Sequence, residues 1–161
     1  AVCADIGCYA LGAASPLRAV ETIVCMGASI GMARGAAEAG VKYSFGVIGD
    51  STFLHSGLTG IVDAVSTKTP MTVIILDNSI VAMTGCQPTM LPSSQLEKIV
   101  VGLGVDPAHV RVLDTKPDKV EENAQIIMEE AEYRGLSVLI LVRECLEAFR
   151  MRRKKEANAN V

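Results

Sequence analysis

The sequence predicts a doubly wound α/β domain in which helices cover both faces of a mostly parallel sheet. Short apolar runs alternate along the chain with amphipathic stretches, which is the order of strands and helices in such domains. The run Thr72–Leu76 is almost wholly β-branched and is typical of a buried parallel strand. Half of the 161 residues are hydrophobic and a fifth are charged, which suits a sheet covered on both sides.

The first half of the chain predicts two strands and two helices. A strand is expected over 2–6, followed by a loop over 7–16. Residues 26–39 are rich in Ala and Gly and have one apolar face, which predicts a helix. A second strand is expected over 43–48. Apolar side chains recur every three or four residues within 55–68, which predicts a second helix.

The second half continues the alternation. Beyond the strand at 72–76, the expected elements are a loop over 80–92, strands over 110–113 and 137–142, and helices beginning at Ser94, Asp118 and Glu147. Ser94 and Glu97 have the spacing of a capping box. In the helix after Asp118, Val120 and Met128 are expected to face the core.

Length and charge exclude several classes of protein. We expect one domain over 1–146, followed by a basic tail or linker over 147–161. The net charge of −3 does not favour binding to nucleic acid, and no apolar stretch is long enough to span a membrane. The five cysteines form no C-x-x-C pair, so a reducing cytoplasm is the simplest setting. Because the chain opens without Met inside an expected strand, we expect it to be a piece of something longer.

Two polar turns are the most informative feature. Gly49-Asp50-Ser51-Thr52 follows the strand at 43–48, and Asp77-Asn78-Ser79 follows the strand at 72–76. In a parallel βαβ unit both turns emerge at the edge where the strands end, which is where such sheets bind ligands. Asp50 and Asn78 should therefore lie side by side, and their oxygens suit Mg²⁺.

A helix cap is the alternative explanation for the first turn, because Asp, Ser and Thr all favour that position. Capping does not explain the second turn, because Asp77-Asn78 precedes a loop. The helix start near Ser51 would also present free N–H groups to an anion such as phosphate. The two turns together predict a site for Mg²⁺ and a diphosphate.

These residues resemble the diphosphate-binding motif of thiamine diphosphate enzymes. The strings 49–57, 76–88, 5–9 and 25–29 are similar to the large subunit of indolepyruvate:ferredoxin oxidoreductases in particular, and the resemblance covers about residues 1–145. Ser51 and Asp77 stand where the wider family usually has Gly and Asn, but both fit the indolepyruvate branch. The resemblance implies that the chain is the diphosphate-binding domain of that subunit.

The resemblance also implies roles for individual residues. Asp50, the Asn78 side chain and the Ile80 carbonyl would ligate Mg²⁺. The diphosphate would be held by residues of the first turn, namely Gly49, Ser51 and Thr52. The cofactor would be lined by residues after the first strand and before the first helix, namely Gly7, Cys8, Gly27, Ala28 and Ser29. Met83 and Thr84 would approach the thiazolium.

His55 has two interpretations from the sequence. As a catalytic residue it would contact the substrate or assist proton transfer. As a structural residue it would be a polar side chain early in a helix, near the surface.

The activity implied by the resemblance needs parts that this chain lacks. In such enzymes the thiamine carbanion attacks a 2-oxo acid, here an aryl pyruvate, and CO₂ leaves. Electrons pass through iron–sulfur clusters to ferredoxin, and the acyl group goes to coenzyme A. A pyrimidine-binding domain supplies the activating carboxylate, and a second subunit is expected. No cluster-binding run of cysteines occurs here, so the chain should be inactive alone.

Two alternatives stay open at this point. In the first alternative, the chain would be the small subunit of a thiamine diphosphate-dependent 2-oxoacid decarboxylase, which needs no clusters. A Mg²⁺-binding receiver-type signalling domain also places an Asp after a central strand. That domain would need an acidic pair after the first strand and a Lys after the last, and Asp5 stands alone while 142–144 contains no Lys.

Overall fold

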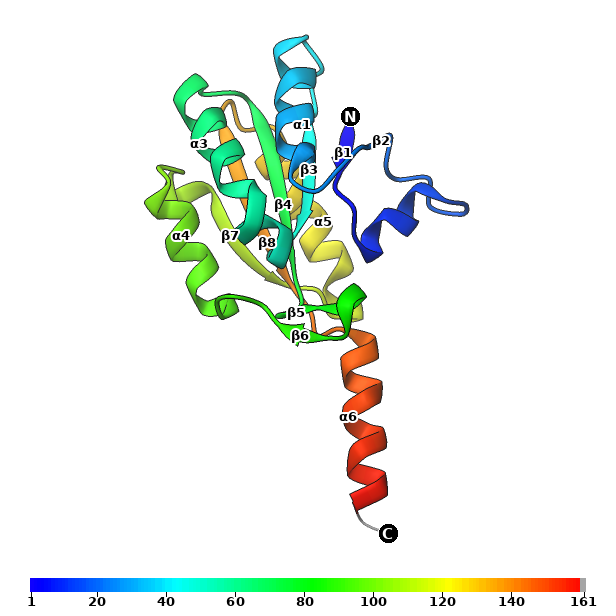
Figure 1. Cartoon of the computed structure of the whole chain (residues 1–161). Helices are drawn as coiled ribbons and strands as arrows, with labels where there is room; N and C mark the ends of the chain where they lie inside the picture. The colour runs from blue at the N-terminus through cyan, green and yellow to red at the C-terminus, as the bar shows by residue number, and fades with distance from the viewer. Residues whose placement is uncertain (160–161) are drawn as a thin grey trace.

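The computed structural model describes residues 1–159 and contains a six-stranded sheet whose neighbouring strands are all parallel (Figure 1). The strand order is β2-β1-β3-β4-β8-β7, and β5 and β6 form a separate antiparallel hairpin. The strands are β1 Val2–Ala4, β2 Thr22–Ile23, β3 Phe45–Gly49, β4 Met71–Asp77, β5 Ile80–Val81, β6 Gln87–Pro88, β7 Val110–Asp114 and β8 Leu136–Val142.

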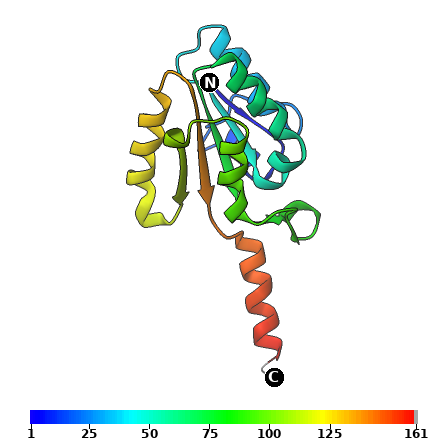
Figure 2. The ribbon, with the colours of Figure 1, turned by 90° about the vertical axis from the view of Figure 1, so that its left-hand side faces the viewer.

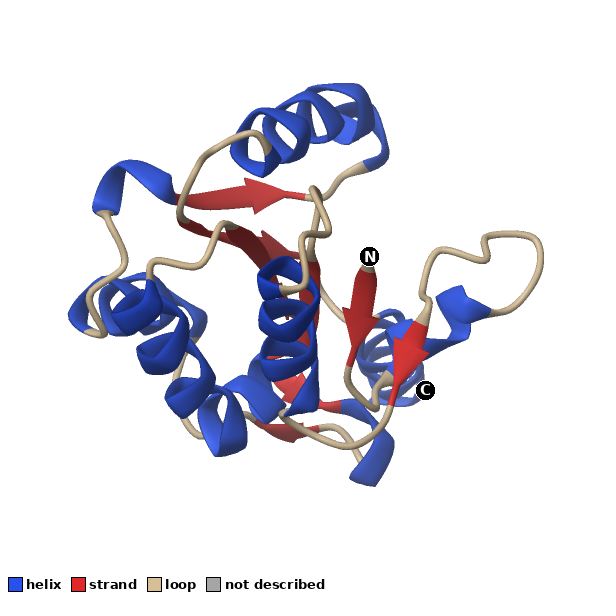
Figure 3. Ribbon diagram, turned by 90° about the horizontal axis from the view of Figure 1, so that it is seen from above, coloured by secondary structure: helices blue, strands red, loops and turns tan. Residues whose placement is uncertain are grey.

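The helices lie on both sides of this sheet (Figures 2 and 3). The longer ones are α1 Ala28–Glu38, α3 Leu58–Thr67, α4 Leu96–Gly102, α5 Val120–Ala131 and α6 Leu146–Ala159. The chain steps in one direction from β2 to β3, β4 and β7, so right-handed crossovers place α1, α3 and α4 on one face. The step from β7 back to β8 reverses, and α5 covers the other face. The predicted doubly wound α/β fold is therefore confirmed.

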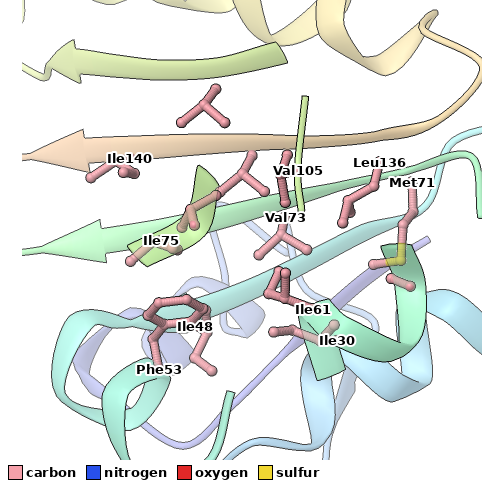
Figure 4. Close-up of a cluster of buried hydrophobic side chains, with 14 of the residues drawn as sticks. Ile30, Ile48, Phe53, Ile61, Met71, Val73, Ile75, Val105, Leu136 and Ile140 are labelled. Carbon is pink, nitrogen blue, oxygen red and sulfur yellow. The ribbon is translucent and has the colours of Figure 1, made fainter. Parts of the chain in front are cut away.

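A continuous apolar core lies between the sheet and the helices α1, α3 and α4 (Figure 4). Ile48 and Ile75 come from the central strands, and Ile30 and Ile61 come from α1 and α3; all four are fully buried. Each such side chain contributes about 1.5–3 kcal/mol through removal from water. Phe53 is also fully buried and lies directly beneath the end of β3.

The helix after β3 begins earlier than its apolar pattern indicates. It begins at Asp50, directly after the strand, and runs as α2 (Asp50–Thr52), the π-helical turn η2 (Phe53–Gly57) and α3. Gly49, in extended conformation, is the residue at the cap. Asp50 therefore occupies the first helical position rather than the cap, and its side chain is available for other contacts.

The expected inward positions of Val120 and Met128 in α5 are wrong, although Ile127 and Ala131 of the same expected stripe are partly buried. Val120 and Met128 are 62% and 52% exposed, whereas Asn123 and Glu130 are buried. These polar side chains face inward because each finds a partner, and the Glu130 carboxylate accepts a hydrogen bond from Arg111 Nε at 2.9 Å. A hydrophobic period cannot reveal partners that come from another strand.

Local sequence also misled at the start of α4. Ser94 and Glu97 form no capping box, because residues 93–95 make the 3₁₀ turn η4 and α4 begins without a side-chain cap. Ser93 Oγ instead lies 2.7 Å from Ser79 Oγ in the turn after β4. The two-residue edge strand β2 was not expected from its sequence. None of the helices within 1–159 is both long and apolar enough to cross a membrane.

Replacing Gly46 by Ala should destabilise the domain. A Cβ at residue 46 would lie 3.2 Å from Ile30 Cα and would push the backbone of α1 away from β3. We expect the free energy of unfolding in urea to fall by about 1–3 kcal/mol. Gly35→Ala in α1 is the control: its Cβ would meet open space, so stability should rise by roughly 0.5–1 kcal/mol. Equal stability of the two variants would contradict this account of the packing.

Candidate functional site

The site lies between β1 and β3, where the connections between strands reverse their direction across the sheet. The chain leaves β1 toward β2 and leaves β3 toward β4, so the segments after these adjacent strands part in opposite directions. Such a switch point opens a crevice at the carboxyl ends of the strands. A cavity of about 300 Å³ occurs there, lined after β1 by residues 6–9, after β3 by residues 49–52 and beyond β4 by residues 78 and 80–84.

Asp50 joins the two polar turns. Its carboxylate is only 4% exposed, although burial of such a group is costly unless it is hydrogen-bonded. Oδ1 accepts from the Ser51 N–H at 2.7 Å. Oδ2 accepts from the N–H groups of Asn78 and Ser79, at 3.2 and 2.8 Å. The structure thus brings Asp50 and Asn78 together, as the parallel arrangement predicts.

The turn after β4 is held by its own side chains. Asp77 Oδ1 accepts from the Ser79 N–H at 3.0 Å, and Asn78 Oδ1 accepts from the Ile80 N–H at 3.1 Å. Ser79 has a φ of 62°, which is uncommon for a residue with a side chain. The turn therefore keeps a strained but fully specified backbone next to Asp50.

Two carboxylates meet in this buried place. Burial raises the pKa of Asp50 to about 6; the Ser51 N–H opposes this shift, and Asp77 adds to it. Asp77 is 2% exposed, and its Oδ2 has no hydrogen-bond partner within the described residues. Two neighbouring buried carboxyl groups with one orphaned oxygen are a cost that a cation would offset.

These donors fit Mg²⁺. A hard cation takes carboxylate and amide oxygens, and Asp50, Asp77 and Asn78 place such oxygens around one turn. No cluster of three or more His, Cys, Asp or Glu that could hold a metal ion occurs in residues 1–159. The remaining ligands of an octahedral ion would come from water or from a bound phosphate.

A third carboxylate supports the opposite wall. Asp5 is fully buried, and its two oxygens accept from the N–H groups of Gly27 and Ser29, both at 2.7 Å. These contacts tie the start of α1 to the end of β1. Gly27 has a φ of 85°, and a Cβ there would lie 2.6 Å from Ser56 Oγ, so the helix after β3 packs against it.

Most, but not all, of the remaining expected site residues line the cavity. Nine line the cavity: Gly7, Cys8, Gly49, Ser51, Thr52, Asn78, Ile80, Met83 and Thr84. Met26 lines it as well, but Gly27, Ala28 and Ser29 do not, and Asp5 uses two of their N–H groups. His55 is exposed in the π-helical turn, outside the cavity lining.

The sequence did not single out Tyr9, which also lines the cavity. Its hydroxyl oxygen accepts from the Gly49 N–H at 3.1 Å. The available signal was its place directly after Gly7-Cys8, in a chain with only three tyrosines.

Comparisons with known proteins agree with this geometry. Residues 5–140 match the family described as thiamine pyrophosphate enzyme, C-terminal TPP binding domain. The indolepyruvate oxidoreductase subunit IorA of Archaeoglobus fulgidus is 33% identical over 162 residues, which cover 94% of this chain and 25% of that protein. The chain thus spans about a quarter of the length of the curated relatives it matches.

Solved structures share the fold. A 2-oxoglutarate:ferredoxin oxidoreductase from Magnetococcus marinus has a TM-score of 0.67 at 17% identity, over 88% of this chain and 53% of that chain. A thiamine diphosphate-dependent 4-hydroxybenzoylformate decarboxylase from Rhodococcus jostii RHA1 has a TM-score of 0.53 at 22% identity, over 74% and 23%. The family match excludes the receiver-type alternative. The chain belongs to the thiamine pyrophosphate enzymes, as their C-terminal TPP-binding domain.

Proposed function

We propose that this chain is the diphosphate- and Mg²⁺-binding domain of a thiamine diphosphate-dependent oxidoreductase that acts on an aryl pyruvate. The observation that carries the proposal is the buried carboxylate of Asp50, which lines a cavity in a TPP-binding domain and lies beside the buried Asp77. The choice of substrate is supported by the relatives named as indolepyruvate oxidoreductase subunits.

The residues of the two turns then have distinct tasks. Asp50, the Asn78 side chain and the Ile80 carbonyl would hold Mg²⁺. Ser51 and Thr52 would bind diphosphate oxygens, with Gly49 beneath them. Gly7 and Cys8 would line one side of the cofactor, and Met83 and Thr84 the other, near the thiazolium. When bound, the cofactor supplies the nucleophilic carbon that allows a 2-oxo acid to lose CO₂.

The rim of the cavity supports a covering partner. Ile6, Met26 and Met83 line the cavity and are still 46%, 49% and 69% exposed. Apolar side chains gathered around an open cavity favour burial against another protein surface. A pyrimidine-binding domain would cover this rim and supply the carboxylate that activates the cofactor, so we expect the chain alone to be inactive.

The remaining parts of the enzyme would lie outside this chain. A second subunit, iron–sulfur clusters, ferredoxin and coenzyme A complete the proposed reaction. Residues 1–146 would form the cofactor domain, and α6 would lead away from it at the end of the sheet that carries the β5–β6 hairpin (Figure 1). All five cysteines are free, which suits the cytoplasm. His55 is exposed outside the cavity, so a catalytic His55 would contact the substrate only if the partner domain brought the substrate to that surface.

Replacing Asp50 by Asn should abolish Mg²⁺-dependent binding of thiamine diphosphate. Loss of an outer partner of a metal ligand already costs about 10–100-fold in affinity, so loss of the ligand charge should cost at least about 100-fold. Isothermal titration calorimetry of the chain in Mg²⁺ buffer measures this. Asp63→Asn is the control, because Asp63 pairs with Arg34 on the surface of α3. Equal affinity of Asp50→Asn and the unaltered chain would refute the assigned ligand.

Removal of the metal should release the cofactor. With thiamine diphosphate at about 100 times its Kd and excess Mg²⁺, binding should stabilise the fold by about 2.7 kcal/mol. For a chain of this length that is a rise in Tm of roughly 5–10 °C. EDTA should reverse the rise, and unphosphorylated thiamine should give none. A shift that persists in EDTA would contradict anchoring through a divalent ion.

The assembled enzyme should reduce a low-potential dye when it is given indolepyruvate and coenzyme A. Dye reduction and CO₂ release should then rise together, because the electrons leave through the clusters. Release of CO₂ without dye reduction would support the decarboxylase alternative instead.

A further inference from the structure

The side chain of Tyr9 packs against the backbone segments that line the cavity. Its ring lies against two glycines: a Cβ at Gly7 would collide with the ring, and a Cβ at Gly49 would lie 3.5 Å from Cε1. Gly7 follows β1 and Gly49 ends β3, so the ring spans the two segments that part at the switch point. Because neither segment carries a side chain there, the ring is held close to both backbones.

The hydroxyl of Tyr9 changes what Gly49 can do. The Gly49 N–H is directed at Tyr9 Oη, at 3.1 Å, and is therefore already used. A ligand in the cavity would meet the tyrosine hydroxyl in place of that N–H. Within residues 1–159 the hydroxyl donates no hydrogen bond of its own, so its proton is available to the cavity that Tyr9 lines. Accepting one hydrogen bond strengthens a hydroxyl as a donor.

The surroundings keep that hydroxyl protonated. Burial raises the pKa of Tyr9 above its ordinary value, and the carboxylates of Asp5 and Asp50 raise it further. The group is therefore a neutral donor across the physiological pH range. Such donors are needed here, because no Lys or Arg is among the residues that line the cavity. An anion bound in it would rely on Mg²⁺, backbone N–H groups and hydroxyls.

We infer that Tyr9 is a diphosphate-binding residue. Its hydroxyl accepts a hydrogen bond from the Gly49 N–H and donates one to a phosphate oxygen of the cofactor. The inference rests on the proposed function. The diphosphate, rather than the thiazolium, is assigned because Gly49 fixes the hydroxyl one residue from Asp50, on the side of the cavity that would hold the metal.

The test is Tyr9→Phe in the full chain, with inorganic pyrophosphate and thiamine diphosphate as separate ligands in Mg²⁺ buffer. A hydrogen bond to a charged oxygen corresponds to a loss of about tenfold to a hundredfold in affinity, and both ligands should weaken equally. Tyr43→Phe is the matched control. Tyr43 precedes β3 at the opposite end of the strand, where its hydroxyl meets exposed Glu132.

The outcomes separate the two proposals. If the unaltered chain binds neither ligand, the proposed function fails and this inference falls with it. If it binds both and Tyr9→Phe binds them equally well, only the inference is overturned. A variant that weakens thiamine diphosphate but not pyrophosphate also overturns it, because Tyr9 would then serve another part of the cofactor.

Gly7→Ala keeps the test decisive if Tyr9→Phe does not fold. The backbone at residue 7 is extended and accepts Ala without strain, but the new methyl group would displace the Tyr9 ring while leaving its hydroxyl present. We expect pyrophosphate affinity to fall about tenfold or more, with no change in the far-ultraviolet circular dichroism. Unchanged affinity with a displaced ring, seen as a shifted near-ultraviolet tyrosine signal, would overturn the inference.

Discussion

The contact on which the site depends is the Asp50 carboxylate, which bridges the helix after β3 and the turn after β4. Three backbone N–H groups from the two turns converge on its oxygens. This arrangement fixes the distance between the ends of two neighbouring strands more firmly than the sheet alone does. It also places the Asp50 carboxylate next to that of Asp77, and the proposed cation would offset the cost of this buried pair.

Asp5 and Asp77 are both buried carboxyl groups, but they differ in how many of their oxygens are hydrogen-bonded. This difference distinguishes a structural role from a role in binding a ligand. Each oxygen of Asp5 accepts a hydrogen bond from a backbone N–H at 2.7 Å, so both oxygens are satisfied. Asp77 is as deeply buried, but its Oδ2 has no partner among the described residues. Since native proteins rarely leave a buried polar atom unpaired, the orphaned oxygen next to Asp50, which does line the cavity, favours a ligand at this pair of carboxylates. Burial alone would have ranked the two residues equally.

Sequence reasoning succeeded where topology and local pattern act together. The polar residues that end β3 and β4 must meet if the strands are parallel neighbours, so the contact between Asp50 and Asn78 could be predicted without coordinates. It failed where a partner comes from a distant segment. Gly27 and Ser29 were expected to line the cofactor, yet their N–H groups donate to Asp5, more than twenty residues away. Tyr9 escaped notice for the same reason.

The carboxylate at residue 77 has a physical consequence. An Asn there would place an amide beside Asp50, whereas Asp77 adds a second buried carboxyl group. A turn with two neighbouring carboxylates would gain more from the proposed divalent ion than a turn with one. Ser79, with its φ of 62° and its N–H shared between both carboxylates, lies at the centre of this balance. The order of the turn and the loading of the site should therefore be coupled, because a ligand that binds only the folded arrangement stabilises it.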